Sequence, residues 1–143
     1  MIQLFKDYKK MFGLKSAKKK TDTVKILIVD DEPDCISIIQ CRLEWCHYDV
    51  ITANNGKEGL EKASQEKPDL ILLDANMPEM NGHEMLERMR KDSALKNIPV
   101  IMVTALCDVK DVDKASSFGI SDYVTKPVDF AKLTEKISNI LKK

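Results

Sequence analysis

The sequence predicts an α/β fold: a doubly wound, five-stranded parallel sheet in a three-layer α/β/α arrangement. Short apolar runs alternate with helical patterns five times from Lys25 onward, which is typical of repeated βα units. The runs are apolar at nearly every position, as in strands buried on both faces. Parallel strands need right-handed crossovers, so helices must cover both faces and the sheet winds in two directions from an inner strand.

The residues that flank each apolar run indicate where the predicted strands and helices begin and end. Strands are expected at approximately 25–30, 48–52, 69–73, 99–103 and 121–124. The first helix follows at Pro33, a residue favoured in a first helical turn. Its apolar positions fall at helical spacing: Ile36, Ile39, Leu43 and Cys46. The second helix begins after a turn and cap at Asn54–Gly56 and ends before Pro68.

The remaining helices complete the alternation. The third begins at Asn81–Gly82, with Met85, Leu86 and Met89 turned inward. The fourth ends near Gly119, a residue type that ends helices by entering the left-handed region. The fifth is the clearest, because its apolar residues make one stripe: Phe130, Leu133, Ile137, Ile140 and Leu141.

Composition excludes several classes of function. The length of 143 residues fits one domain, and the 23 basic and 23 acidic residues cancel, so the whole molecule offers no field for nucleic acid. No apolar run reaches the roughly 18 residues of a membrane span, and the start lacks the features of a signal peptide. We expect a cytoplasmic protein with no direct nucleic-acid contact.

The first residues differ in character from the rest. Residues 1–20 hold seven lysines against the single acid Asp7, and Ile2, Phe5, Tyr8 and Phe12 fall near helical spacing. One interpretation is a frayed, solvated tail. The other is a basic amphipathic helix that contacts a membrane surface or an acidic partner. We therefore divide the chain into an extension, 1–23, and a domain, 24–143.

Polar side chains stand at the ends of four predicted strands. Asp30 and Asp31 follow the first, Asp74 the third, Thr104 the fourth and Lys126 the fifth. Because the loops after parallel strands share one edge of the sheet, these residues meet there. Three converging carboxylates repel one another unless a cation joins them, and an all-oxygen cluster suits a hard divalent ion such as Mg²⁺. The sequence therefore predicts a metal-dependent acidic site.

Each of these residues also has an ordinary structural explanation. Asp30 and Asp31 could cap the helix near Pro33, a role worth about 1 kcal/mol. Lys126 alone would be a solvated surface lysine, and Thr104 alone a strand-end hydroxyl. Capping does not explain Asp74, and chance does not place the whole set on one edge. The functional interpretation is therefore favoured.

The order and spacing of these residues closely resemble the receiver domain of two-component response regulators. The resemblance covers residues 25–142 and rests on Asp-Asp, on Asp-x-x-Met-Pro-x-Met-x-Gly beginning at Asp74, on Thr-Ala at 104–105 and on Lys-Pro at 126–127. It implies the (βα)5 flavodoxin-like receiver fold. It also implies a phosphoprotein in which Asp74 is the phosphoacceptor. A sensor histidine kinase or histidine phosphotransfer protein would supply the phosphoryl group from a phosphohistidine, giving an aspartyl phosphate.

The same resemblance assigns roles to the other site residues. Mg²⁺ would be held by the carboxylates of Asp31 and Asp74, by the backbone carbonyl of Asn76 and, largely through bound water, by Asp30. The Lys126 ammonium and the Thr104 hydroxyl would contact the phosphoryl oxygens.

The resemblance further implies a two-state switch. Tyr123 would turn inward when Thr104 moves toward the phosphoryl group, and a downstream target would read the face formed by the fourth helix, fifth strand and fifth helix. Asn76 and Leu106 stand where the family tunes the lifetime of the phosphoryl group: Asn76 can orient a water, whereas Leu106 hinders one. His83 is expected to be exposed on the third helix.

We interpret the chain as a single-domain response regulator whose output is a protein contact, because no further domain follows residue 143. It would be no enzyme beyond self-phosphotransfer and autodephosphorylation. One alternative is an Mg²⁺-dependent phosphohydrolase of similar fold, but Asn76 stands where its second acid would be. Another is a receiver-like interaction module that is never phosphorylated, which the complete set of acids, lysine and threonine disfavours.

Overall fold

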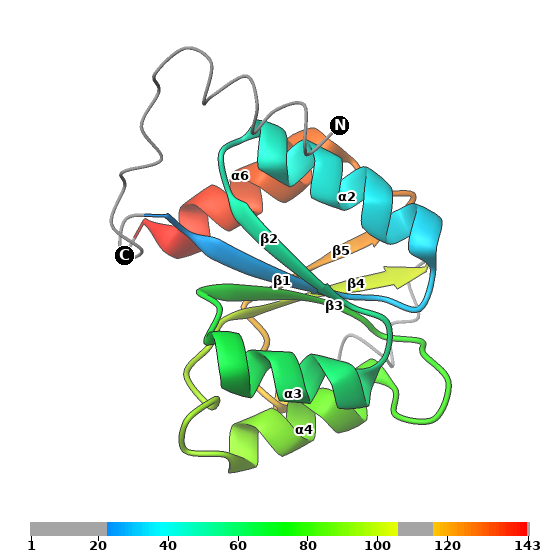
Figure 1. Ribbon diagram of the computed structural model, residues 1–143, viewed down its shortest axis with the longest axis vertical. Coiled ribbons are helices and arrows are strands. Elements are labelled where there is room, and N and C mark those ends of the chain that lie inside the picture. Colours follow the sequence, from blue (N-terminus) through cyan, green and yellow to red (C-terminus); the bar gives the residue numbers. More distant parts are fainter. Residues whose placement is uncertain (1–22, 106–115, 143) are drawn as a thin grey trace.

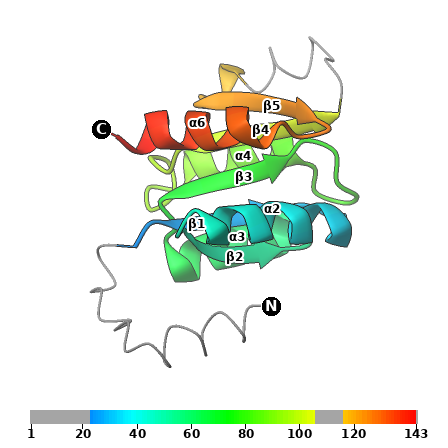
Figure 2. The same cartoon turned by 90° about the horizontal axis from the view of Figure 1, so that it is seen from above.

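A computed structural model describes residues 23–105 and 116–142. Its core is a five-stranded sheet with the order β2-β1-β3-β4-β5, visible in Figure 2. All neighbouring strands pair in parallel. The strands are β1 (Lys25–Val29), β2 (Asp49–Ala53), β3 (Leu70–Asp74), β4 (Val100–Ala105) and β5 (Asp122–Lys126). The chain winds from β1 outward to β2 and then, on the other side, to β3, β4 and β5, so the predicted doubly wound sheet is confirmed.

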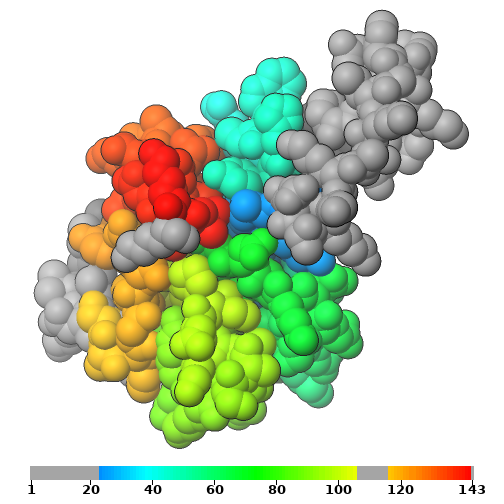
Figure 3. Space-filling view, turned by 90° about the vertical axis from the view of Figure 1, so that its left-hand side faces the viewer, coloured from blue at the N-terminus to red at the C-terminus, as the bar shows by residue number. Residues whose placement is uncertain are grey.

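Helices cover both faces of the sheet. In Figure 1, α2 (Pro33–Trp45) and α6 (Phe130–Leu141) lie on one face, and α3 (Gly56–Glu66) and α4 (Gly82–Lys91) lie on the other. Figure 3 shows the same layers from the side where the strands begin. The fourth predicted helix falls mostly on residues 106–115, outside the described residues. Residues 116–117 are helical, and Gly119 has a φ of 76°, so the chain leaves the helical geometry where predicted.

Successive residues of each inner strand pack on opposite faces of the sheet. Ile26 and Ile28 of β1 pack in the cluster that contains Leu43 of α2 and Leu133 of α6. Leu27 and Val29 pack in the opposite cluster with residues of the other two helices, among them Ala63, Met85, Leu86 and Met89. Because both faces are covered, every residue of β3 is buried. This explains the unbroken apolar runs from which the sheet was predicted.

Four strands end later than predicted, β2 and β3 by one residue and β4 and β5 by two. β4 continues to Ala105 and β5 to Lys126, because the two strands keep pairing as far as Ala105 opposite Lys126. Thr104 and Lys126 therefore lie inside their strands rather than after them. The helix starts agree with the prediction: the side chains of Asn55 and Asn81 accept hydrogen bonds from the N–H groups of Glu58 and Glu84.

The expectation for His83 is wrong. Its side chain is buried, with 6% of its surface exposed. It lies in the first turn of α4, which packs directly on the end of β3, where the N–H of Gly82 donates to the carbonyl of Ala75 at 3.1 Å. Helical spacing places a residue on one side of a helix, but it does not show how closely the loop after β3 encloses this turn.

No helix within residues 23–105 and 116–142 is both long enough and apolar enough to cross a membrane.

Arg90 joins α4 to the turn that leads into β5. Its guanidinium donates to four backbone carbonyls at 2.9–3.1 Å, those of Lys96, Ile98, Phe118 and Gly119. One side chain thus fixes two loops that no strand pairing holds. Since β5 carries Lys126, this clamp helps to position the candidate site.

We expect Arg90→Lys to lower the free energy of unfolding by about 1.5–3 kcal/mol, because an ammonium cannot replace the fork of donors that satisfies these carbonyls. Urea unfolding monitored by circular dichroism measures the change. Arg88→Lys, at an exposed position of the same helix, is the matched control and should be nearly neutral. Equal stability of the two variants would contradict the role given to Arg90.

Candidate functional site

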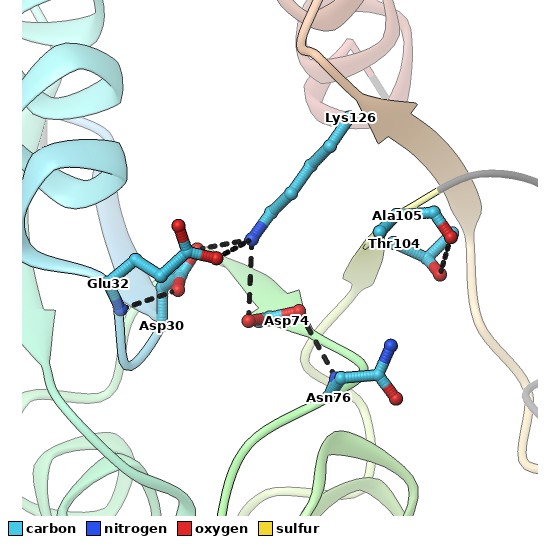
Figure 4. A network of polar contacts seen from close by, with 7 residues as sticks. All are labelled: Asp30, Glu32, Asp74, Asn76, Thr104, Ala105 and Lys126. Atoms are coloured by element: carbon cyan, nitrogen blue, oxygen red, sulfur yellow. Dashed lines mark hydrogen bonds and ion pairs between the residues drawn. The ribbon is translucent and has the colours of Figure 1, made fainter.

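The carboxyl ends of β1, β3 and β5 bring a lysine among three carboxylates. The Nζ of Lys126 lies 3.2 Å from Oδ2 of Asp30, 3.3 Å from Oε1 of Glu32 and 3.4 Å from Oδ2 of Asp74. Figure 4 shows Lys126 reaching across from β5 to the acids. The predicted meeting of Asp30, Asp74 and Lys126 at one edge of the sheet is therefore present.

Strand order explains this arrangement. β1 and β3 are neighbours, so Asp30 and Asp74 stand side by side at the ends of adjacent strands. β5 is separated from β3 by β4, so only a long side chain can reach the acids from there. The Lys126–Pro127 peptide bond that follows is cis.

Glu32 is a site residue that the sequence analysis missed. Its N–H donates to Oδ1 of Asp30 at 2.9 Å, and its carboxylate contacts Lys126 although its side chain is 65% exposed. The sequence does contain a sign of this role, because Glu32 is the third acid of the run Asp30-Asp31-Glu32. Only the first two acids of that run were predicted to belong to the site. Because Glu32 lies beyond the strand, the pattern of apolar residues did not show where its side chain would turn.

The acids form a cluster with the donor set of a hard cation. Asp30, Asp31, Glu32 and Asp74 each offer a carboxylate oxygen, and these oxygens lie within 4.8 Å of one another. The ammonium of Lys126 contacts three of these four carboxylates, so negative charge is in excess among the described residues of the cluster. All-oxygen sites of this kind suit Mg²⁺. The residues present therefore fit the predicted metal.

The electrostatics of Asp74 reflect this excess charge. The pKa of the Asp74 carboxyl is raised to about 7, chiefly by burial and also by the neighbouring charge of Asp30, against the opposing effects of the Asn76 N–H and of Lys126. The Asn76 N–H donates to Oδ1 of Asp74 at 3.2 Å. A carboxylate that burial makes costly to ionise gains from any cation placed beside it.

The neighbours of Asp74 respond to the same field. Burial alone lowers the pKa of Lys126, but the charges of Asp74 and Asp30 outweigh it and raise the pKa above its ordinary value. The ammonium therefore stays charged. Burial, together with a hydrogen bond with Asp30, raises the pKa of the Cys35 thiol to about 11. Cys35 thus borders the site as a neutral thiol.

The other predicted residues lie at varying distances from this network. Thr104 is buried, but its hydroxyl donates to the carbonyl of Ala105 at 3.4 Å, and Figure 4 shows it apart from the acids. The side chain of Asn76 is exposed. Tyr123 lies near the start of β5 with 40% of its surface exposed, and Nζ of Lys136 stands 5.7 Å from its ring centroid. Leu106 lies outside the described residues.

Gly82 explains the last position of the motif that begins at Asp74. A Cβ on this residue would lie 2.3 Å from the backbone oxygen of Asp74 and 3.0 Å from Cα of Ala75. The start of α4 can approach the end of β3 only because this position has no side chain. The first turn of α4 therefore packs on the backbone of Asp74, while the carboxylate of Asp74 faces Lys126.

Fold and site together define the class of protein: a doubly wound domain with an acidic cluster and one lysine at the carboxyl edge of its sheet. Comparison with protein families gives the same result, because the family described as "Response regulator receiver domain" matches residues 26–138. The chain belongs to this family. The resemblance found in the sequence is confirmed.

Individual relatives support this assignment. The chain is 39% identical over 119 residues to the "Alkaline phosphatase synthesis transcriptional regulatory protein PhoP" of Bacillus subtilis, an alignment that covers 83% of this chain and 49% of the relative. Chemotaxis protein CheY4 of Vibrio cholerae has a similar structure, with a TM-score of 0.79, 29% identity and coverage of 83% and 99% of the two chains. A CheY-like receiver domain protein from Methanospirillum hungatei is 33% identical, with a TM-score of 0.79 and coverage of 84% and 94%.

The chain spans about half the length of the curated relatives that it matches first. Those relatives are named as transcriptional regulators and not as enzymes.

The raised pKa of Asp74 predicts a pH dependence of stability. Because it lies at about 7, above the ordinary value of 3.8, the folded chain binds more protons than the unfolded chain between these values. Ionisation of Asp74 therefore destabilises the metal-free fold as the pH rises through this window, by at most about 1.4 kcal/mol per pH unit. Asp74→Asn removes this loss, so its gain in stability over the parent should grow with pH and level off above about 7.

Urea unfolding in the presence of a chelator, at several pH values, measures this difference. Asp34→Asn, which changes an exposed carboxyl of α2, is the matched control. Parallel pH curves for the parent and Asp74→Asn would contradict the raised pKa.

Proposed function

We propose that this chain is a phosphoacceptor receiver of a two-component phosphorelay and that Asp74 takes the phosphoryl group. The observation that carries the proposal is the pairing of buried Asp74 with Lys126, 3.4 Å apart, inside a cluster of four carboxylates. Only a cation-assisted reaction of an anionic group makes use of a nucleophile, an ammonium and excess acids at one edge. The receiver domain occupies residues 24–143, and residues 1–23 form an extension before it.

The reaction is a transfer between two side chains. A carboxylate oxygen of Asp74 forms a bond to phosphorus while the bond from phosphorus to the donor's histidine nitrogen breaks, and its electron pair stays on the imidazole. Mg²⁺, when bound, neutralises the phosphoryl oxygens and lowers the repulsion between them and the carboxylate. Asp31, Asp74 and the backbone carbonyl of Asn76 would hold it, and Asp30 would act largely through bound water.

The residues of the chain have separate tasks in this step. The Asn76 N–H, which donates to Oδ1 of Asp74, fixes the rotation of the carboxylate. Lys126 places a positive charge beside Oδ2 and follows the phosphoryl oxygens once they arrive. For this it exchanges its contacts with Asp30 and Glu32 for contacts with the phosphoryl group. Water that reaches the phosphorus later hydrolyses the aspartyl phosphate, and Asn76 and Leu106 set how fast it does so.

The output is a change of surface. Thr104 donates to Ala105 in this structure, and it turns its hydroxyl toward the phosphoryl group once that group is present. Tyr123, whose ring is exposed here, moves inward behind it. The face made by the segment that ends near Gly119, by β5 and by α6 then binds the target protein.

The cellular setting follows from this role. Receiver domains interact with histidine kinases and with downstream effectors, so the donor is a sensor histidine kinase or a histidine phosphotransfer protein in the cytoplasm. The output of this chain is a protein contact rather than direct binding of nucleic acid. Beyond its own phosphotransfer and dephosphorylation we assign it no enzymatic activity.

Phosphorylation is tested by intact mass after incubation with acetyl phosphate and Mg²⁺. We expect the parent to gain one phosphoryl group, to lose the gain when a chelator is added, and Asp74→Asn to gain nothing, because Asp74 begins the receiver motif and is the proposed phosphoacceptor, whereas Asp30, also buried beside Lys126, is not expected to replace it. Asp34→Asn is the control and should behave as the parent. No gain from acetyl phosphate or from a phosphohistidine donor would overturn the proposal, and turnover of free phosphate esters would indicate a phosphohydrolase instead.

The switch is tested with beryllofluoride, which mimics the phosphoryl group. In the presence of Mg²⁺ we expect shifts in the NMR signals of the Tyr123 ring and of residues 116–120, since the threonine and the tyrosine move together. Thr104→Val keeps the shape but lacks the hydroxyl, so its Tyr123 signals should stay near those of the free form. Unchanged Tyr123 signals in the beryllofluoride-bound parent would contradict the switch.

A further inference from the structure

The outer side of α2 carries an exposed apolar stripe. Ile38 is 56% exposed and Trp45 is 74% exposed, and with Tyr123 they are the large exposed hydrophobic residues of the described chain. Cys41, also exposed, lies between them in sequence. Residues 38, 41 and 45 are three and four positions apart, so they share one side of the helix. We call these three residues the α2 stripe.

The stripe lies opposite the face that α2 buries. Ile36, Ile39 and Leu43 turn toward the sheet, and at 100° per residue their mean direction is roughly opposite to that of the stripe. Single exposed apolar residues are ordinary, but an aligned set marks a contact surface. Apolar residues on two opposite sides are typical of a helix that packs against other segments on both sides.

The start of the described chain lies at the end of this stripe. The carbonyl of Val24 accepts a hydrogen bond from the N–H of Asp49 at 2.9 Å, four residues beyond Trp45. Val24 also packs against the same apolar cluster as Tyr48. In Figure 3 the blue start of β1 lies beside the cyan end of α2. The described chain therefore begins beside the turn that follows Trp45.

That segment has the composition and length to cover the stripe. Its apolar residues repeat at helical spacing: Met1, Leu4, Phe5, Tyr8, Met11 and Phe12. As a helix, residues 2–12 would extend about 15 Å, against about 10 Å from Ile38 to Trp45. Residues 13–22, if extended, span roughly 33 Å, enough for the helix to fold back along α2.

The charges beside the stripe favour this occupant. Asp34, one turn before Ile38, places an acid at the start of this side of α2. The basic Arg42 is turned away, with its guanidinium 4.9 Å from the ring centroid of Phe130 on α6. Lys6, Lys9 and Lys10 of the amino-terminal segment supply the opposite charge.

We propose that residues 1–12 of this chain dock on its own α2 stripe and cover Ile38, Cys41 and Trp45. The contact is independent of phosphorylation. It assigns the basic amphipathic segment a partner inside the same chain rather than a membrane.

Trp45 is the only tryptophan of the chain, so its fluorescence reports directly on the stripe. The measurement is acrylamide quenching of the full chain, compared with the double variant Phe5→Ser, Phe12→Ser. We expect Trp45 of the parent to emit at shorter wavelength and to be quenched several-fold less efficiently than in the variant. Gln3→Ser with Asp7→Ser, which spares the apolar positions, is the matched control and should resemble the parent.

A second readout is the rate at which Cys41 reacts with a maleimide, followed by peptide mass, which should rise in the double variant. Equal thermal unfolding of the variants shows that the domain itself is unchanged. Equal quenching in the parent and the double variant would overturn the proposal. Protection that grows with protein concentration would replace it with docking on a second copy, and protection only with anionic vesicles would replace it with a membrane surface.

Discussion

The structure depends on one electrostatic constraint, the adjacency of Asp30 and Asp74 at the carboxyl ends of neighbouring strands. The two buried carboxylates at the ends of adjacent β1 and β3 repel each other, and burial makes the ionisation of Asp74 costly. The side chain of Lys126 reaches across β4 from β5 and places a single ammonium beside both carboxylates. Because the ammonium balances only part of the charge, the site is left with a capacity for a further cation. This residual charge, more than any single contact, connects the fold to its chemistry.

The elements around the site hold this arrangement fixed. Gly82 packs closely on the backbone of Asp74, so the end of β3 cannot shift away from Asp30 and Lys126. On the same helix, Arg90 ties down the loops that lead into β4 and β5, and therefore the strand that carries Lys126. Helix α4 thus supports both members of the Asp74–Lys126 pair, although it contributes no charged group to the site. Preorganisation of this kind comes from backbone contacts, which a substitution in the acids would leave intact.

The sequence predicted the parts of the fold that follow from patterns of apolar residues. Continuous apolar runs indicated strands covered on both faces, and the ends of those runs marked Asp30, Asp74, Thr104 and Lys126. What it missed depends on contacts between distant segments. The ends of β4 and β5 were set by their mutual pairing, and the burial of His83 was set by the packing of α4 on β3. The turn of Glu32 toward Lys126 depends on a lysine 94 positions away, which no local pattern contains.

The sharing of one lysine among three acids has a consequence for how the site works. Asp30 and Asp74 are buried, whereas Glu32 is largely exposed, and an exposed ion pair is worth little. A cation that neutralises the carboxylates of Asp30 and Asp74 weakens their attraction for the Lys126 ammonium. The ammonium is then held mainly by Glu32. In the proposed transfer, the ammonium can then leave that weak partner for an incoming phosphoryl oxygen with little loss. The exposed acid therefore keeps the lysine near the site without trapping it, and a stronger, buried third partner would compete with the phosphoryl group itself.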